Sequence, residues 1–227
     1  FMKDVAPILV QNCIACHKGP VFADDLFHNL GLDDQGTHDT GHIDGAPVLQ
    51  ADPFNVRANN MIEVLKHLAG YTTVETDHYK VLVDPAQDAL TGKYMALYLE
   101  KVHKELTDRF GYQLPAKTQI EILKSHRWFS ARTIGLPFIP TVGACTGKVV
   151  ALASPRATGK PFHWARVLKH EVVHVITLQQ TEFNIPHWYT EALAVESEGF
   201  PRPQPWNKML LERVPARRLL NLDTINL

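Results

Sequence analysis

The strongest chemical signal in this chain is the string H-E-V-V-H at residues 170–174. Neutral imidazoles are the commonest metal ligands among side chains, and residues four apart on a helix lie about 40° apart around its axis. His170 and His174 can therefore reach one Zn²⁺. Glu171 lies beside the open coordination position, where it can take a proton from a water that the metal activates. The pattern predicts a zinc site with Glu171 as the general base.

A catalytic zinc needs a third protein ligand, and the sequence offers a carboxylate at a suitable place. The longer motif with a third histidine is absent, because its glycine and histidine positions hold Thr177 and Gln180. Pro186 opens a further predicted helix, which carries Glu191 in its first turn and a half. A short loop between the two helices would bring Glu191 back to both histidines and complete a set of two histidines and one glutamate.

Other side chains near this segment receive lesser roles. Glu198 lies seven residues after Glu191 on nearly the same helical face. It could accept a hydrogen bond from the imidazole of a metal-binding histidine, whereas Glu196 projects from a different face. Trp188 and Tyr189 are expected to pack the ligand helix into the core, although a tyrosine near zinc could assist a substrate carbonyl. Four other histidines are interpreted as surface or packing residues: His103, His126, His163 and His187.

A second motif, C-I-A-C-H, occupies residues 13–17. In this pattern Cys13 and Cys16 form thioethers to the vinyl groups of haem c, and His17 becomes the proximal ligand of the iron. The sixth ligand stays open among four residues: His28, His38, His42 and Met61. Two other interpretations also stay open, a surface cysteine pair or disulfide and a zinc knuckle that uses both cysteines and a histidine.

The elements that must position these residues follow from apolar periodicity and turn signals. Helices are expected over five segments: about 53–69, 90–110, 163–179, 186–198 and 206–214. Strands are expected over three: 79–83, 118–123 and 148–153. Asp52 and Pro53 would be the N-cap and first residue of the first helix, and a loop punctuated by glycine and proline would separate the last two strands. These elements indicate an α+β fold.

Length and composition indicate a globular chain with a sizeable core, since 45% of its 227 residues are hydrophobic. Residues 1–47 are rich in glycine, aspartate and histidine, so much of this segment is expected to be loop. With the C-I-A-C-H motif, they would form an incomplete haem-attachment segment of loop and helix. Residues 48–72 would form a connecting helix. Residues 73–227 would form the metal-binding domain, which we expect to continue beyond Leu227.

The charge balance argues against two classes of partner. Lys and Arg number 23 and Asp and Glu number 24, so the formal net charge of −1 gives no electrostatic reason to expect nucleic acid or an anionic membrane. No apolar run approaches the roughly 18 residues of a membrane span. We therefore expect neither a nucleic-acid partner nor a membrane span.

Residues 75–227 resemble the gluzincin, or peptidase-MA-like, zinc metallopeptidases, the clan of thermolysin. The resemblance depends on the H-E-V-V-H string and on W-Y-T-E-A-L-A at residues 188–194. It implies a zincin-like fold, in which a mixed sheet supports the two ligand-bearing helices, with His170, His174 and Glu191 as zinc ligands. It also implies that strand 148–153 is the edge strand with which an extended peptide substrate pairs.

Residues 5–45 resemble the bacterial di-haem cytochrome c peroxidases. The resemblance depends on V-A-P-I-L-V-Q-N at residues 5–12, before the cysteines, and on G-P-V-F-A-D at residues 19–24, after them. It implies a small cytochrome-c-like segment with covalently attached haem c. The route by which such haem is attached implies a periplasmic or other extracytoplasmic location.

The leading hypothesis is a zinc-dependent metallopeptidase that acts on a peptide or protein substrate. Glu171 would accept a proton from the water and pass it to the leaving amine. Two alternatives stay open. The chain could be a c-type haem redox or electron-transfer protein whose zinc-binding domain is a non-catalytic scaffold, or a binding module that keeps zinc and holds a peptide without cleaving it.

Overall fold

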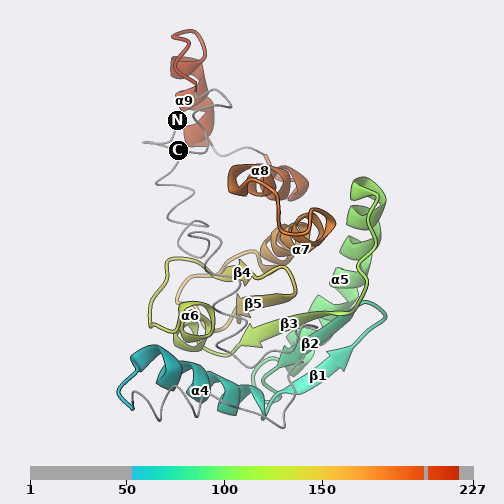
Figure 1. The fold of residues 1–227 in the computed structure, drawn as a ribbon, viewed down its shortest axis with the longest axis vertical. Coiled ribbons are helices and arrows are strands. Elements are labelled where there is room, and N and C mark those ends of the chain that lie inside the picture. The colour runs from blue at the N-terminus through green and yellow to red at the C-terminus, as the bar shows by residue number, and fades with distance from the viewer. Residues whose placement is uncertain (1–52, 202–203, 220–227) are drawn as a thin grey trace.

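A five-stranded sheet between two layers of helices forms the body of the protein (Figure 1). The computed structural model describes residues 53–201 and 204–219. Its helices are α4 (Val56–Leu68), α5 (Ala89–Phe110), α6 (His126–Ile134), α7 (Trp164–Gln180), α8 (His187–Ser197) and α9 (Gln204–Arg213). Its strands are β1 (Thr72–Glu75), β2 (Tyr79–Val83), β3 (Thr118–Leu123), β4 (Gly143–Cys145) and β5 (Val149–Ala153).

The sheet is mixed, with the strand order β1-β2-β3-β5-β4. The central strands β2, β3 and β5 are parallel, and β1 and β4 pair antiparallel with them at the two edges. The expected α+β fold with a mixed sheet is therefore confirmed. The expectation that strand 148–153 lies at an edge is wrong, because β5 pairs with β3 on one side and with β4 on the other. The edge strand at this end of the sheet is β4.

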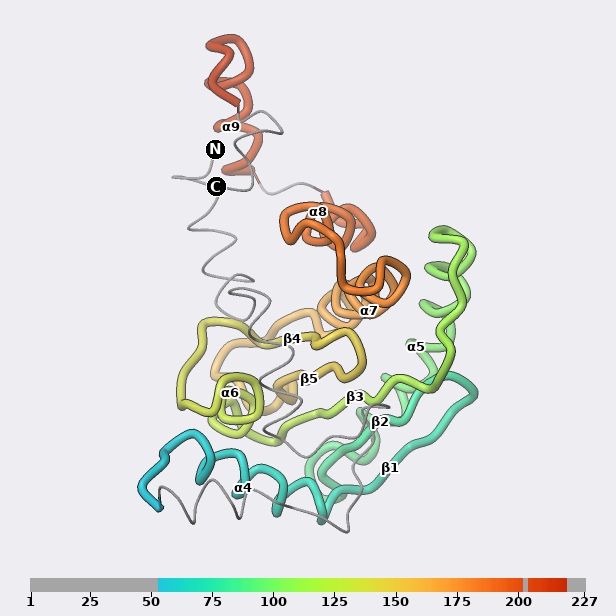
Figure 2. The backbone as a smooth tube through the Cα atoms, viewed as in Figure 1, coloured from blue at the N-terminus to red at the C-terminus, as the bar shows by residue number. Residues whose placement is uncertain are grey.

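One face of the sheet packs against α5 and α7 and encloses the larger core. Alternate strand residues reach this core, as the pleat of a β-strand requires. Its fully buried members from both strands and helices include Val81, Leu99, Ile120, Val150 and Val172. This packing holds α7 against β4 and β5, at the edge of the sheet (Figure 2).

The other face carries a smaller core under α4 and α6, to which Val64, Phe129 and Ala151 belong. On this face the carboxylate of Glu121 is fully buried and accepts two hydrogen bonds from the guanidinium of Arg132 on α6. Removing one partner of such a buried pair costs about 3–5 kcal/mol, because the other charge is left uncompensated. The pair therefore ties α6 firmly to β3.

Several elements differ from the sequence-based expectation. α4 begins later than expected, at Val56, because the side chain of Asn55 accepts a hydrogen bond from the backbone N–H of Ala58 and caps the helix there. Asp52, the expected cap, lies outside the described residues. The segment expected as a loop between β3 and β5 contains α6, capped by Ser125, and the short β4. β1 has no counterpart among the expected strands.

The remaining elements match the expected ones. The five expected helices correspond to α4, α5, α7, α8 and α9, and the three expected strands to β2, β3 and β5. α8 packs on α7, whereas α9 extends away from the body and has no buried residue (Figure 1). Among the described residues, no helix is both long and apolar enough to span a membrane.

Candidate metal centre

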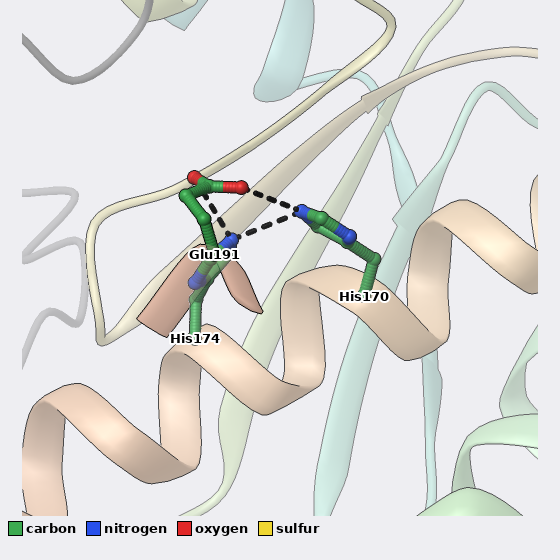
Figure 3. A group of neighbouring side chains, drawn as sticks. All are labelled: His170, His174 and Glu191. Carbon is green, nitrogen blue, oxygen red and sulfur yellow. Dashed lines mark hydrogen bonds and ion pairs between the residues drawn. The ribbon is translucent and has the colours of Figure 1, made fainter. Parts of the chain in front are cut away.

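Two consecutive helices bring His170, His174 and Glu191 together in the interior (Figure 3). The histidines lie one turn apart on α7, and Glu191 reaches them from α8. All three are buried, with 7%, 2% and 2% of their surface exposed, respectively. The Nε2 atoms of the two histidines are 3.1 Å apart, and the nearest Glu191 oxygens lie 3.4 Å from His170 Nε2 and 3.5 Å from His174 Nε2.

These three separations, of which the first Glu191 distance is to Oε2 and the second to Oε1, are of the size expected around a single tetrahedral metal ion. Two ligand atoms that each lie about 2.1 Å from Zn²⁺ at the tetrahedral angle are about 3.4 Å apart. The observed separations of 3.1, 3.4 and 3.5 Å are close to that value. Two imidazoles and one carboxylate also suit zinc chemically, and when the carboxylate binds through one oxygen they leave one of the four positions for water or substrate.

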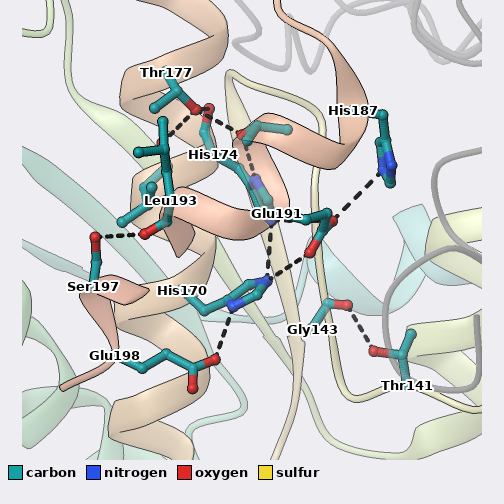
Figure 4. A network of polar contacts seen from close by, with 12 residues as sticks. Thr141, Gly143, His170, His174, Thr177, His187, Glu191, Leu193, Ser197 and Glu198 are labelled. Carbon is teal, nitrogen blue, oxygen red and sulfur yellow. Dashed lines mark hydrogen bonds and ion pairs between the residues drawn. The ribbon is translucent and has the colours of Figure 1, made fainter. Parts of the chain in front are cut away.

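Glu198, at the end of α8, orients the ring of His170 (Figure 4). One Glu198 oxygen lies 2.9 Å from His170 Nδ1, and the other accepts a hydrogen bond from Nε of Arg166. Because a carboxylate can only accept, we assign the ring proton of His170 to Nδ1, and the Nε2 lone pair then faces Glu191. Glu198 therefore holds His170 in the tautomer that binds a metal.

His174 is oriented by a chain of hydroxyl groups instead of a carboxylate (Figure 4). Its Nδ1 lies 2.8 Å from Thr190 Oγ1, which lies 2.8 Å from Thr177 Oγ1. Thr177 in turn donates to the backbone carbonyl of Val173, which can only accept. The chain therefore runs in one direction, from the Nδ1 proton through the two hydroxyls to the carbonyl. This direction again leaves the Nε2 lone pair facing the metal-binding group.

Glu171 lies between α7 and the edge strand β4. Its carboxylate is so close to Gly143 that a Cβ there would stand 2.6 Å from Glu171 Oε1. Its Oε2 is buried and has no hydrogen-bond partner among the described residues. Burial raises the pKa of Glu171 to about 7, and the nearby carboxylates of Glu191 and Glu198 act in the same direction. A carboxyl group with such a pKa suits proton transfer near neutral pH.

The turn between α7 and α8 is anchored on the hairpin that joins β4 to β5. Gln179 donates a hydrogen bond of 2.6 Å to the carbonyl of Gly147, and a Cβ on Gly147 would stand 2.5 Å from the ring of Phe183. Glu182 and Phe183 have φ angles of 51° and 63°, a backbone conformation that is costly for residues other than glycine. This anchored turn returns the chain so that Glu191 faces the histidines, as the spacing predicts.

His187 is a site residue that the sequence-based interpretation missed. The sequence indicates a surface or packing residue at position 187, but His187 Nε2 lies 3.6 Å from Glu191 Oε1. The four-residue spacing of His187 and Glu191 indicates this proximity, because residues four apart share one face of a helix. Tyr189, the side chain considered for the substrate carbonyl, lies about 160° from Glu191 around α8 and is half-exposed.

The other residues singled out in the sequence lie elsewhere. Each of three histidines has a structural partner: the Tyr79 hydroxyl for His103, the Thr141 carbonyl for His126 and the Arg166 N–H for His163. Glu196 forms an ion pair with Arg109 of α5. Cys13, Cys16 and His17 lie outside the described residues, so haem attachment stays a prediction.

Comparison of the chain with protein-family models, with curated proteins and with solved structures found no match. The resemblances to gluzincins and to cytochrome c peroxidases therefore stay predictions from short motifs. The metal-binding group is defined instead by the positions of its own donor atoms.

Proposed function

We propose that this protein is a zinc-dependent metallopeptidase with a zincin-like domain. The observation that carries the proposal is the near-tetrahedral spacing of the donor atoms of His170, His174 and Glu191. Two histidines and one glutamate with an open fourth position are typical of hydrolytic zinc enzymes. A bound zinc ion would supply a Lewis acid and would lower the pKa of a water to about 7.

Glu171 is suited to move the proton in this reaction. Its Oε2 accepts a proton from the attacking water, and the same carboxyl group then gives that proton to the departing amine. His170 and His174 keep their Nδ1 protons, since Glu198 and Thr190 hold them there.

The edge strand β4 supports a peptide as the substrate. Val142 and Thr146, on either side of this strand, bond to β5 through their backbones. Because residues of an antiparallel pair alternate in direction, the backbone groups of Gly143 and Cys145 point away from β5. An extended peptide can add to such an edge as a further strand. Its backbone would then lie next to the carboxylate of Glu171.

Cleavage of a peptide library tests this function. The full chain is loaded with Zn²⁺ and incubated with peptides of mixed sequence, and the products are identified by mass spectrometry. We expect cleavage that stops when a chelator removes the metal and returns when zinc, but not magnesium, is restored. Protein that contains zinc and cleaves no peptide would contradict the proposal and favour the peptide-binding module.

A further inference from the structure

Four side chains connect the start of α7 with the end of α8, beside His170. His163 is the N-cap of α7, and Arg166 lies in the first turn of that helix. Glu198 is the C-cap of α8, and Phe200 follows it by two residues. The name outer cluster is used below for these four residues: His163, Arg166, Glu198 and Phe200. None of them is one of the three metal-binding residues, so their role must be found in what they contact.

Arg166 is held from three sides within the outer cluster. Its Nε donates a hydrogen bond to Glu198, and its guanidinium carbon lies 5.2 Å from the centre of the Phe200 ring. The backbone N–H of Arg166 donates to His163 Nδ1 at 3.2 Å. The rings of His163 and Phe200 meet edge to face, with 5.0 Å between their centres. These contacts fix the direction of the Arg166 side chain, although that side chain is 38% exposed.

Glu198 connects this arginine to the metal-binding group. Its side chain is only 8% exposed, and each of its two oxygens has a partner of its own. One oxygen accepts the hydrogen bond from Arg166, and the other lies 2.9 Å from His170 Nδ1 (Figure 4). A carboxylate that is bound at both oxygens is held in one plane, which adds geometric specificity to the added energy. Arg166 therefore holds the other oxygen of Glu198 toward the His170 ring.

We propose that Arg166 is a positioning residue of the metal centre, which acts on His170 through Glu198 and is itself held by Phe200. This inference rests on the metal-binding part of the proposed function and does not depend on peptide cleavage. Groups that hydrogen-bond to a metal-binding histidine orient its ring, and their loss lowers the affinity for the metal. The outer cluster extends this dependence to the segment that follows α8. The affinity for zinc then depends on Phe200, which lies outside both ligand-bearing helices.

The zinc affinity of Arg166→Met tests the inference, with Arg109→Met as the matched control. Methionine keeps an unbranched apolar stem and cannot donate to Glu198, so we expect the affinity to fall by about tenfold in competition with a chromogenic chelator. Arg109 pairs with Glu196, whose side chain is 64% exposed, and Arg109→Met should bind zinc as the wild type does. Arg166→Lys keeps a charged donor and should recover part of the affinity.

Two double-mutant cycles separate positioning from a general effect on packing. In Glu198→Ala the connection from Arg166 to His170 is already broken, so adding Arg166→Met should change the zinc affinity by less than about twofold. Phe200→Leu removes the aromatic face and should lower the affinity by about two- to fivefold. That loss should disappear when Arg166→Met is also present. Phe200→Tyr keeps the ring and should bind zinc as the wild type does.

The inference is overturned if Arg166→Met binds zinc as tightly as the wild type. It is also overturned if Arg166→Met causes the same loss in the Glu198→Ala background, because Arg166 would then act only through the packing of α7. A wild-type chain that binds no zinc after reconstitution would overturn the metal centre itself, and the inference with it. Peptide cleavage enters none of these measurements, so failure of the inference and failure of the peptidase function are distinguishable.

Discussion

Gly143 of the edge strand lies against the carboxylate of Glu171, so that a Cβ at position 143 would stand 2.6 Å from Glu171 Oε1 and 2.6 Å from Val167 Cγ1. Such contacts are too short for any real side chain, so Gly143→Ala must displace β4 or Glu171. We expect peptide cleavage to fall by about 10- to 100-fold, because small misplacements of reacting groups have effects of this size. Steady-state kinetics of the zinc-loaded variant measures the loss.

Gly159→Ala is the control for this substitution. A Cβ at position 159 would meet no atom within 4 Å, so the variant should cleave peptides at the wild-type rate. The zinc content of Gly143→Ala should also be that of wild type, because the atoms nearest to a Cβ at position 143 belong to Glu171 and Val167 and not to the three ligands. Wild-type kinetics in Gly143→Ala would contradict the placement of the Glu171 carboxylate beside the edge strand β4.

Replacing Glu171 by glutamine separates proton transfer from metal binding. The amide keeps the size of the side chain and cannot accept the proton, so we expect kcat to fall at least about 100-fold. Metal analysis should find as much zinc as in the wild-type protein. Glu196→Gln is the matched control, since Glu196 is exposed and pairs with Arg109 instead of the metal-binding group. A Glu171→Gln variant with nearly full activity would exclude Glu171 as the general base.

Thr190 supports His174 only through its hydroxyl, so Thr190→Val isolates that contact. Valine has a similar shape but cannot accept a hydrogen bond from His174 Nδ1, and loss of such a partner weakens metal binding by about 10- to 100-fold. Competition with a chromogenic chelator measures the affinity for zinc. Thr190→Ser restores the hydroxyl and should recover most of the affinity. Equal affinities in the valine variant and the wild type would refute the chain of hydroxyls.

The buried His103 predicts a dependence of stability on pH. Burial lowers the pKa of His103, and the stacked ring of His78 acts in the same direction. The unfolded chain, in which this pKa is about 6.5, therefore binds more protons than the folded chain below that pH. It follows that the contribution of His103 to the free energy of unfolding is present above about pH 6.5 and declines as the pH falls.

Urea unfolding of wild type and His103→Leu, with chelator present, tests this dependence. Between about pH 7.5 and 5.5 the free energy of unfolding should fall less in the variant than in the wild type. The substitution also removes the hydrogen-bond partner of the Tyr79 hydroxyl. This loss changes the free energy of unfolding by a similar amount at both pH values, so it leaves the pH dependence unaffected. Identical slopes would show that His103 is protonated equally in both states.

The helices that carry the site could be predicted from the sequence because their signals are local. The H-E-V-V-H string and its apolar neighbours indicate α7, and Pro186 marks the start of the next helix. The return of Glu191 to the histidines follows from the short connection between the two helices. Glu198 could also be predicted, because seven residues after Glu191 amount to nearly two full turns.

The missed features depend on tertiary contacts. β4 is three residues long and contains only Gly143, Ala144 and Cys145, so no alternation or β-branched residue marks it as a strand. It forms because β5 offers it an edge to pair with. The hydroxyl chain through Thr190 and Thr177 depends on how α8 is rotated against α7. That rotation is set by packing and by the anchored turn, neither of which has a local sequence pattern.

The metal centre is tested most directly by the zinc content of the full chain, purified without added metal, beside the variants Glu191→Ala and Glu196→Ala. We expect Glu191→Ala to contain one zinc ion per chain fewer than the wild type, and Glu196→Ala to contain as much as the wild type. Counting the difference keeps any zinc bound by Cys13 and Cys16 out of the result. If the wild type binds no zinc even after reconstitution, or if Glu191→Ala retains all of it, the metal centre described here does not exist.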